Sequence, residues 1–239
     1  MSGAGSRLTV LVTGGSSASG IAVARALHKA GHRVFTVGSD QARIEAAAAE
    51  AGGGVTPLTC DLAAPDGVRR LRADVTAAAG PVDAVIHLVG GWRGGKGITD
   101  QSDEDWEFLH RGAVTTLRNV SRVFYDDMAA SPTGRFVMVS STSLDKPAAG
   151  VASYVAAKAA AEAWTMAVAD GFRTAAGDGG DAAAVVLVVK ALVDDAMRRR
   201  NPGRGFPGAT DVEDLAAAVV ELFDRPGSEL NGTRLRLAD

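Results

Sequence analysis

Tyr154 and Lys158 are the residues of this sequence whose types and spacing best suit acid–base chemistry. They lie four residues apart in an alanine-rich stretch that predicts a helix from Ser153 to Ala175, so both side chains would share one helix face. A free phenol has a pKa near 10, and a lysine ammonium about 4 Å away would favour the phenolate by at most roughly 4 kcal/mol at an effective dielectric constant of ~20. That influence brings a tyrosine toward the range needed for proton transfer, whereas the structural alternative is a buried tyrosine beside a solvated lysine.

Ser141 is the third candidate catalytic residue and lies thirteen residues before Tyr154. It follows an apolar run, Gly134 to Ser140, that predicts a buried strand. A hydroxyl at the carboxyl end of this strand would be placed to hold a substrate oxygen beside the phenol. The alternative is a serine that only caps the following turn.

A glycine-rich turn, Thr13-Gly14-Gly15-Ser16-Ser17-Ala18-Ser19-Gly20, joins the first predicted strand to the first predicted helix. Glycine allows the sharp turn and the close approach of backbone N–H groups to a pyrophosphate, and the helix N-terminus adds its partial positive charge. A glycine-rich turn is weak evidence alone, but its position inside a strand–helix–strand unit favours nucleotide binding over a purely structural turn.

The elements that would position these residues alternate along the whole chain. The predicted strands are Leu8–Val12, Val34–Val37, Val55–Cys60, Val82–Val89, Gly134–Ser140, Ala183–Val189 and Thr233–Leu237. The predicted helices are Ile21–Ala30, Gln41–Ala51, Gly67–Ala79, Ser102 to about Ala130, Ser153–Ala175 and Thr210 to about Asp224. Two of these helices begin with a pair of residues that resembles a capping box, Ser102 with Asp105 and Thr210 with Glu213. This alternation predicts one α/β domain over residues 1–239, a doubly wound seven-stranded parallel sheet with helices on both faces.

The composition of the chain excludes several classes of function. The chain has 239 residues, 46% of them hydrophobic and 22% charged, and a net charge of −3, so neither disorder nor an overall attraction to nucleic acid or anionic lipid is expected. The single cysteine, Cys60, excludes an internal disulfide and a cysteine-based zinc cluster, and no histidine–acid cluster has metal spacing. No signal-like or membrane-spanning apolar stretch occurs, so a cytoplasmic protein that binds a small molecule is expected.

Together these features resemble the short-chain dehydrogenase/reductase family. The resemblance rests on Thr13-Gly14 with Gly20, Asp61-Leu62, Gly90, and Ser141 with Tyr154-Val155-Ala156-Ala157-Lys158, and it spans Leu8 to Asp239. It implies a Rossmann-like NAD(P)-dependent oxidoreductase that moves a hydride between nicotinamide and a carbonyl or secondary alcohol. Tyr154 would be the general acid/base, Lys158 would lower its pKa and hold the nicotinamide ribose, and Ser141 would orient the substrate.

The resemblance also implies a set of cofactor-binding residues: Gly14, Ser16, Ser17, Ser19, Gly20, Gly38, Ser39, Asp61, Leu62, Gly90, Val193, Tyr154 and Lys158. A family member that prefers NAD would carry an acid at Gly38. Gly38 and Ser39 instead leave room and a hydroxyl for a 2′-phosphate, and Arg43 could add charge, whereas Asp40 weighs against this. NADP is therefore the preferred cofactor, with NAD as the alternative.

Three positions depart from the family pattern. Ala18 replaces a glycine of the turn, Ala113 replaces the asparagine of a water-linked proton relay, and Lys190-Ala191 replaces a Pro-Gly pair that faces the nicotinamide. Asn119 is not an obvious substitute, because six residues turn a helix by about 240°. These departures keep open a cofactor-binding regulator with little catalysis.

Two residues are candidates for substrate contact. Trp92 lies in Gly-Gly-Trp-Arg-Gly-Gly, which resembles the same loop of dihydropteridine reductases, and it could stack on a flat ring or pack at a subunit contact. Lys190 could meet an acidic substrate or the cofactor carboxamide, although pairing with Asp194 or Asp195, or extension of the amine to solvent, is the simpler expectation. The helices from Ser102 and Ser153 correspond to those that form tetramers in the family, so a homotetramer or homodimer is expected.

Overall fold

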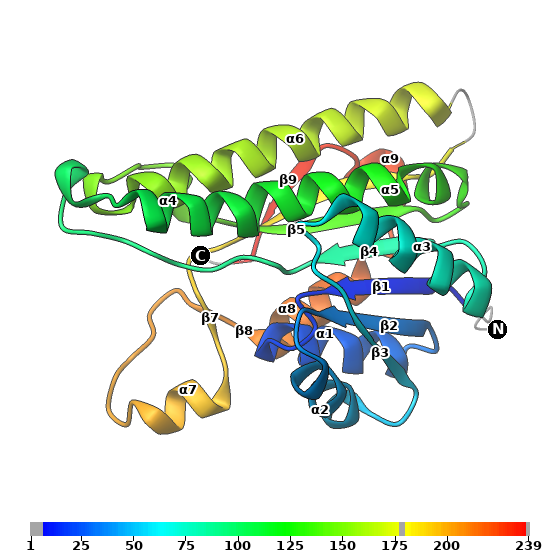
Figure 1. The fold of residues 1–239 in the computed structure, drawn as a ribbon, viewed down its shortest axis with the longest axis horizontal. Coiled ribbons are helices and arrows are strands. Elements are labelled where there is room, and N and C mark those ends of the chain that lie inside the picture. The colour runs from blue at the N-terminus through cyan, green and yellow to red at the C-terminus, as the bar shows by residue number, and fades with distance from the viewer. Residues whose placement is uncertain (1–6, 177–179, 238–239) are drawn as a thin grey trace.

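The computed structural model describes residues 7–176 and 180–237, and within them a seven-stranded parallel sheet forms the centre of the molecule (Figure 1). Its strands are β1 (Thr9–Thr13), β2 (Arg33–Gly38), β3 (Val55–Thr59), β4 (Ala84–His87), β5 (Arg135–Ser141), β6 (Ala183–Val189) and β9 (Thr233–Arg236), in the order β3-β2-β1-β4-β5-β6-β9. The predicted seven-stranded α/β fold is confirmed.

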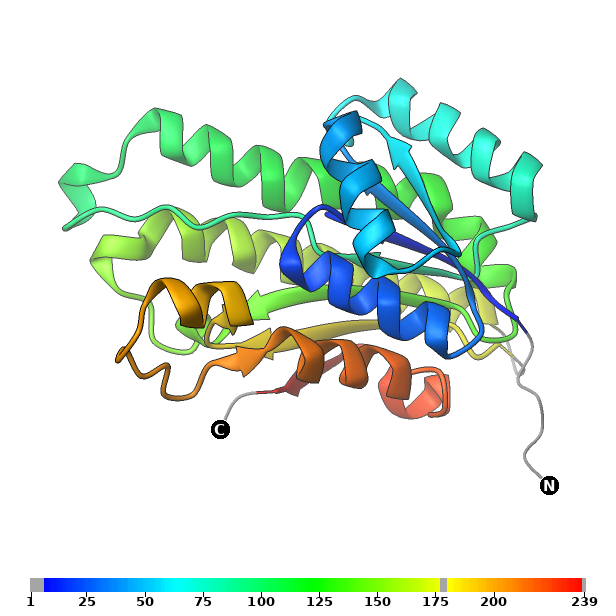
Figure 2. The ribbon, with the colours of Figure 1, turned by 90° about the horizontal axis from the view of Figure 1, so that it is seen from below.

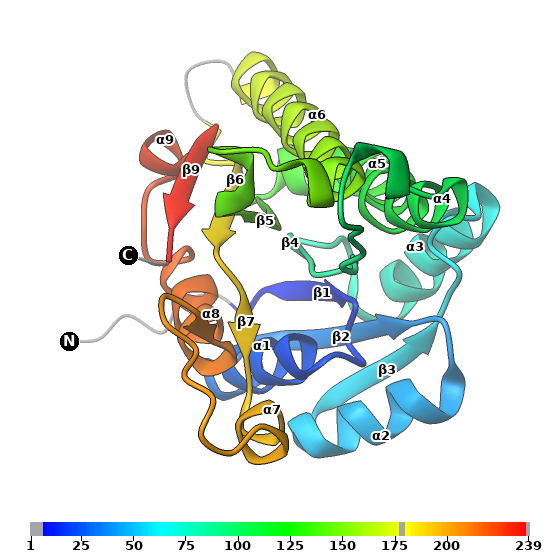
Figure 3. The ribbon, with the colours of Figure 1, turned by 90° about the vertical axis from the view of Figure 1, so that its left-hand side faces the viewer.

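Helices cover both faces of this sheet (Figure 3). They are α1 (Ala18–Lys29), α2 (Gln41–Ala51), α3 (Pro65–Ala79), α4 (Asp103–His110), α5 (Thr116–Ala130), α6 (Ala152–Ala176), α7 (Asp195–Arg200), α8 (Val212–Glu221) and α9 (Gly227–Leu230). Helices α3, α5 and α6 lie on one face, and α1, α2 and α8 lie on the other, where α1 and α8 run side by side (Figure 2). None of the helices in the described part of the chain is both long and apolar enough to cross a membrane.

The inner strands are buried because helices cover them on both sides, whereas the edge strands β3 and β9 are only partly buried. All residues of β1 and of β6 are buried, as the near-continuous apolar runs predict for parallel strands. Along β1, Leu11 faces the core shared with α3, α5 and α6, whereas Val10 and Val12 face the core shared with α1 and α8. This alternation with a period of two fixes which strand ends and loops meet at the sheet edge.

The helix expected from Ser102 to Ala130 is continuous but irregular. Ser102 caps α4 as predicted, and its hydroxyl accepts a hydrogen bond from the Asp105 amide at 3.1 Å. A single π-helical turn, Arg111–Thr115, then separates α4 from α5, although the two form one rod in Figure 1. Such turns often accompany functional sites.

One predicted cap is wrong. The residue that caps α8 is Asp211, whose carboxylate accepts from the Glu213 amide at 3.0 Å, and not Thr210. Thr210 is occupied elsewhere, because it pairs with Leu192 in a two-stranded ribbon of β7 (Leu192–Val193) and β8 (Thr210–Asp211). This ribbon and α7 were not predicted, and they lie beyond the carboxyl end of β6.

From β1 the chain adds strands outward on one side of the sheet, β2 and then β3, and it then returns to the other side of β1 with β4. Chain segments leaving β1 and β4 therefore turn away from each other at their carboxyl ends. In open α/β sheets a crevice forms at such a position, and ligands bind there.

Candidate active site

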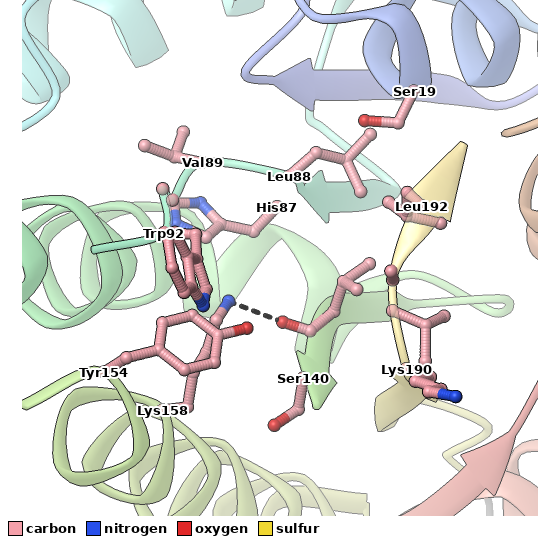
Figure 4. Close-up of a pocket in the computed structure, with 15 residues that line it drawn as sticks. Ser19, His87, Leu88, Val89, Trp92, Ser140, Tyr154, Lys158, Lys190 and Leu192 are labelled. Atoms are coloured by element: carbon pink, nitrogen blue, oxygen red, sulfur yellow. Dashed lines mark hydrogen bonds between the residues drawn. The ribbon is translucent and has the colours of Figure 1, made fainter. Parts of the chain in front are cut away.

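Tyr154 and Lys158 lie in the first two turns of α6, and both point into a cavity at the carboxyl ends of β4, β5 and β6 (Figure 4). The cavity has a volume of about 530 Å³. Between them on the helix, Val155 and Ala157 are buried, so the helix has one face packed on the protein and one face open to the cavity. The four-residue spacing thus brings the two side chains together as predicted.

Lys158 is anchored by main chain. Its Nζ donates a hydrogen bond to the carbonyl oxygen of Val139 at 2.8 Å, shown as the dashed line in Figure 4. Burial lowers the pKa of Lys158 to about 8, and the carboxylate of Glu162, one turn further along α6, acts in the opposite direction. The amine therefore changes its charge close to physiological pH.

Ser141 is the last residue of β5 and is buried. Burial raises the pKa of Tyr154, and a hydrogen bond from the Ser141 hydroxyl opposes this rise, because a donor stabilises the phenolate. Ser141 thus lowers the pKa of Tyr154 in this structure, and the amine of Lys158 is bonded to the carbonyl oxygen of Val139.

The glycine turn forms the other wall of the crevice. Gly14 has φ +76°, and a Cβ there would lie 2.8 Å from the Leu88 backbone, so only glycine fits between β1 and β4. Ser17 caps α1, with its hydroxyl accepting from the Gly20 amide at 3.0 Å and donating to the Gly14 carbonyl at 2.8 Å. The turn is therefore held with the N-terminus of α1 at the crevice, which favours a bound anion.

A second cavity, of about 400 Å³, adjoins the glycine turn. Of the predicted cofactor residues, it is lined by Gly14, Ser16, Ser17, Gly38, Ser39, Asp61, Leu62 and Gly90. Ser19 lines the first cavity instead. Arg111 of the π-helical turn also lines the second cavity, and its guanidinium pairs with Asp61 at 2.7 Å.

The two cavities share Leu88, Val89 and Gly90, which follow β4. They therefore form one elongated crevice that runs from Ser39 and Asp61 at one end to Tyr154 at the other. Its length, the helix N-terminus at its middle and the closely packed glycine turn fit a dinucleotide. Within the described residues, no group of histidine, cysteine and acidic side chains is arranged to hold a metal ion.

His87, the last residue of β4, is buried below the first cavity and is hydrogen-bonded on both ring nitrogens. Its Nδ1 lies 2.8 Å from the Thr13 hydroxyl and its Nε2 lies 3.2 Å from the Thr116 hydroxyl. Burial lowers the pKa of His87 to about 3, and the charge of Lys158 adds to this effect. The imidazole is thus neutral, and it joins β1, β4 and the start of α5.

The position where the family carries its relay asparagine is occupied by a packed alanine. Ala113 lies in the π-helical turn, is buried with Leu109 and Ala157, and has Tyr154 packed against this cluster. Asn119 is directed elsewhere, because its amide donates to the carbonyl oxygens of Leu62 and Ala63, both at 3.1 Å. As expected from the turn of the helix, Asn119 does not replace the missing side chain.

The remaining predicted residues are Trp92, Lys190 and Val193. Trp92 lines the first cavity and is 63% exposed. Lys190 also lines it, with its amine directed away from Tyr154 (Figure 4). Its Nζ donates to the carbonyl oxygen of Pro207 at 2.8 Å and not to the expected Asp194 or Asp195. Val193 lies in β7 with its side chain buried and does not line either cavity.

Comparison with known proteins agrees with this geometry. The model of the short chain dehydrogenase family matches residues 8–176, which is more than half of the chain. The chain belongs to the short-chain dehydrogenase/reductase family. Members of this family are NAD(P)-dependent oxidoreductases.

Curated relatives are identical to this chain at less than a third of the aligned residues. The acetoacetyl-CoA reductase of Allochromatium vinosum is 30% identical over 167 residues, which cover 66% of each protein. The chain spans between half and two thirds of the length of the first curated relatives it matches.

Two solved structures have the same fold. The crystal structure of an NAD⁺-bound xylitol dehydrogenase superposes with a TM-score of 0.84 at 19% identity and covers 97% of each chain. An NADPH-bound short chain oxidoreductase of Pseudomonas aeruginosa PAO1, described as having an atypical catalytic center, also has a TM-score of 0.84 at 19% identity, and covers 96% of this chain and 94% of the other.

Several residues at the site were missed from the sequence. Arg111 lines the second cavity, Gln101 accepts from the Ser153 amide next to Tyr154, and Thr13 and Thr116 hold His87. The π-helical turn that places Arg111 and Thr116 has no signal in hydrophobic periodicity. The sequence does show a histidine at the end of a predicted buried strand. A buried imidazole needs a hydrogen-bond partner for each ring nitrogen, and this need is the one clue that could have predicted the threonine contacts.

Proposed function

We propose that the chain is an NAD(P)-dependent oxidoreductase that interconverts a carbonyl and a secondary alcohol. The observation that carries the proposal is that Tyr154 and Lys158, one helical turn apart, line a cavity at the end of β5, where Ser141 is buried, and that this cavity continues to the glycine turn. The match to acetoacetyl-CoA reductase, whose name describes a carbonyl reduction, agrees with this reaction class.

Each of the three side chains has a role that follows from its surroundings. The Ser141 hydroxyl donates to the substrate oxygen and fixes its position beside the phenol. In reduction, the phenol of Tyr154 gives its proton to that oxygen as negative charge develops there, and in oxidation the phenolate takes the proton back. The charged amine of Lys158 stabilises the phenolate by its positive field. The bound nicotinamide supplies or accepts the hydride.

The experiment that tests this role is NAD(P)H oxidation by the Tyr154→Phe variant. The variant loses only the hydroxyl, so turnover of a panel of ketones and quinones should fall by about a thousandfold or more while the cofactor still binds. Undiminished turnover would contradict the proposal. Cofactor binding without turnover of any acceptor by the unmodified protein would favour the cofactor-binding regulator.

We further propose that NADP is preferred over NAD. Gly38 and Ser39 line the second cavity without an acidic side chain, and a Cβ at Gly38 would come within 2.5 Å of the Ser16 hydroxyl. The nearby Asp40 is engaged in capping α2, where its carboxylate accepts from the Arg43 amide at 2.8 Å. The measurement is the ratio of dissociation constants for NADPH and NADH, and tighter binding of NADH would overturn this preference.

A second candidate substrate class is a planar ring, of the pterin or quinonoid kind. It is favoured by Trp92, whose indole lines the cavity close to Tyr154 and Lys158 in Figure 4 and is largely exposed. Stacking on an indole stabilises a flat ring much more than a small aliphatic ketone. If Trp92→Ala weakens turnover of quinonoid acceptors and leaves that of aliphatic ketones unchanged, the planar class is the correct one.

We also propose a homo-oligomer, a tetramer or a dimer, formed through α5 and α6. A shallow cavity between these helices is lined by Tyr125, Trp164 and Val168, so apolar surface is available there. Light scattering coupled to size-exclusion chromatography measures the mass, and a monomer at micromolar concentration would contradict this proposal.

A further inference from the structure

Gln101 joins two segments that border the substrate end of the crevice. It lies just before α4, and its side-chain amide is half-buried between the loop 90–97, which carries Trp92, and the 3₁₀ turn Ala149–Val151, which leads into α6. Figure 1 and Figure 2 both show the chain after β4 running to the end of the molecule where α4 and α6 begin.

The oxygen of this amide completes the start of the catalytic helix. Gln101 Oε1 accepts a hydrogen bond from the Ser153 amide at 3.1 Å, next to Tyr154. The first amides of a helix have no partner within the helix, and a side chain at the cap position normally supplies one. Val151, which precedes α6, has no acceptor in its side chain, so Gln101 supplies the acceptor from another segment.

The nitrogen of the same amide holds the Trp92 loop. Gln101 Nε2 donates to the Gly97 carbonyl at 3.1 Å and is 3.4 Å from the carbonyl oxygens of Ala149 and Gly150. The two segments also bond directly, because the Gly95 amide donates to the Gly150 carbonyl at 2.7 Å. One side chain therefore fixes both segments through its two ends.

The loop 90–97 and the 3₁₀ turn pack so closely that a movement of one would displace the other. A Cβ on Gly94 would lie 2.9 Å from the Gly150 carbonyl oxygen and 3.0 Å from the indole of Trp92. The indole thus lies on the backbone of the loop at the point where that loop meets the 3₁₀ turn. Any shift between loop and turn moves Trp92 relative to Tyr154.

We propose that Gln101 is a positioning residue for substrate: it fixes the separation of Trp92 and Tyr154, and thereby the width of the substrate end of the cavity. The inference rests on the proposed oxidoreductase function and adds to it a determinant of substrate affinity. The carboxamide is required because one end must accept from an amide and the other must donate to carbonyls.

The test is the pair Gln101→Glu and Gln101→Met. Glutamate keeps an acceptor for the Ser153 amide but places a second oxygen against the carbonyls of the loop, so it separates the two roles. We expect Gln101→Glu to raise KM for the carbonyl substrate by about fivefold or more with kcat changed less than about twofold, because binding is lost and the proton-transfer geometry is kept. Methionine removes both contacts and should lower kcat as well.

Hydrogen exchange on the protein without substrate gives a readout that does not depend on activity. In Gln101→Glu the Gly95 amide should exchange about tenfold faster and the Ser153 amide should keep its protection, whereas both should exchange faster in Gln101→Met. Ser102→Ala is the matched control, because it removes the neighbouring cap of α4 without touching these contacts, and it should change stability but neither KM nor the Gly95 amide.

The double variant Gln101→Glu, Trp92→Ala decides whether Gln101 acts through the indole. If it does, the glutamate adds no further rise in KM once Trp92 is absent. Additive effects, or a Gln101→Glu variant with unchanged KM and unchanged Gly95 exchange, would overturn the inference. If the unmodified protein turns over no acceptor, the proposed function fails, and the exchange rates still decide whether Gln101 holds the two segments.

Discussion

The Nδ1 atom of His87 accepts a hydrogen bond from the hydroxyl of Thr13, 2.8 Å away. The direction follows from the far side of the ring, where the Thr116 hydroxyl donates to the Gly112 carbonyl at 2.6 Å and can only accept from Nε2–H of His87. Both nitrogens are therefore committed, and the imidazole cannot replace the missing relay asparagine as a proton carrier. It connects the glycine-turn strand to the π-helical turn.

This arrangement predicts a pH-dependent contribution to stability. The pKa of His87 is lowered from 6.5 to about 3 in the folded protein, so the unfolded chain takes up a proton that the folded chain refuses. The contribution is present above pH 6.5 and is lost as the pH falls from 6.5 toward 3, by about 2 kcal/mol between about pH 7 and about pH 5. His87→Gln lacks this titration, so its unfolding free energy in urea should fall less steeply over that range. Equal slopes for both proteins would contradict the prediction.

The lowered pKa of Lys158 predicts an alkaline limit of carbonyl reduction. Reduction needs the Tyr154 proton and the charged amine, so kcat/KM should fall as the pH rises through about 8. Glu162 raises the pKa of Lys158, and Glu162→Gln should therefore move this fall to lower pH. Asp170→Asn, an exposed change further along α6, is the control and should leave the profile in place. A profile unmoved by Glu162→Gln would show that another group sets the limit.

Gly14→Ala should damage both the fold and the cofactor site. The residue has φ +76° and backbone 2.8 Å from its Cβ position, so alanine combines conformational strain with a clash. We expect a loss of more than about 1 kcal/mol of stability and no measurable NADPH binding in a fluorescence titration. Gly31→Ala is the matched control, because Gly31 has φ +94° with nothing within 4 Å, and it should lose stability but bind the cofactor normally. Normal NADPH affinity in Gly14→Ala would contradict the assignment of the turn.

Arg135 is the largest fully buried side chain of the described residues and should be essential for stability. Its guanidinium pairs with Asp181 at 3.0 Å and donates to the carbonyl oxygens of Leu222 and Arg225 at 3.0 and 2.7 Å. Arg135→Met leaves these acceptors without a donor and should cost about 3–5 kcal/mol in urea unfolding. Arg173→Met removes an exposed arginine paired with Asp170 and should cost less than about 1 kcal/mol. Similar costs for the two variants would show that the buried pairing is dispensable.

The sequence allowed the sheet and the placement of Tyr154 and Lys158 at one cavity to be predicted because both depend on local patterns. Apolar runs identified all seven sheet strands, and the four-residue spacing placed Tyr154 and Lys158 on one helix face. The π-helical turn escaped prediction because hydrophobic periodicity carries no signal for it, and Thr116 beside it contacts His87, 29 residues away. The capping role given to Thr210 failed for a similar reason, since pairing with Leu192 removes that residue from the helix start.

The hydrogen-bond partners of polar side chains were the least predictable feature. Lys190 was expected near acids of its own segment, but its amine reaches Pro207, whose carbonyl comes close only through the fold of the loop after α7. Gln101 gave no signal at all, because a glutamine before a helix is common and its partners on the far segment, Ala149, Gly150 and Ser153, lie 48 to 52 residues further along the chain. Hydrophobic periodicity locates helices and strands in the sequence. Contacts between side chains and distant segments can be identified only from the folded structure.

The oxygen that holds Lys158 belongs to the peptide backbone at Val139, and so it is independent of which side chain position 139 carries. Mutational drift at that codon leaves the lysine tethered, provided that β5 keeps its pairing of Val139 with Leu187. The effects of substitutions at position 139 would therefore come from lost packing against the core and from a changed cavity wall, and the tether of the amine would survive them.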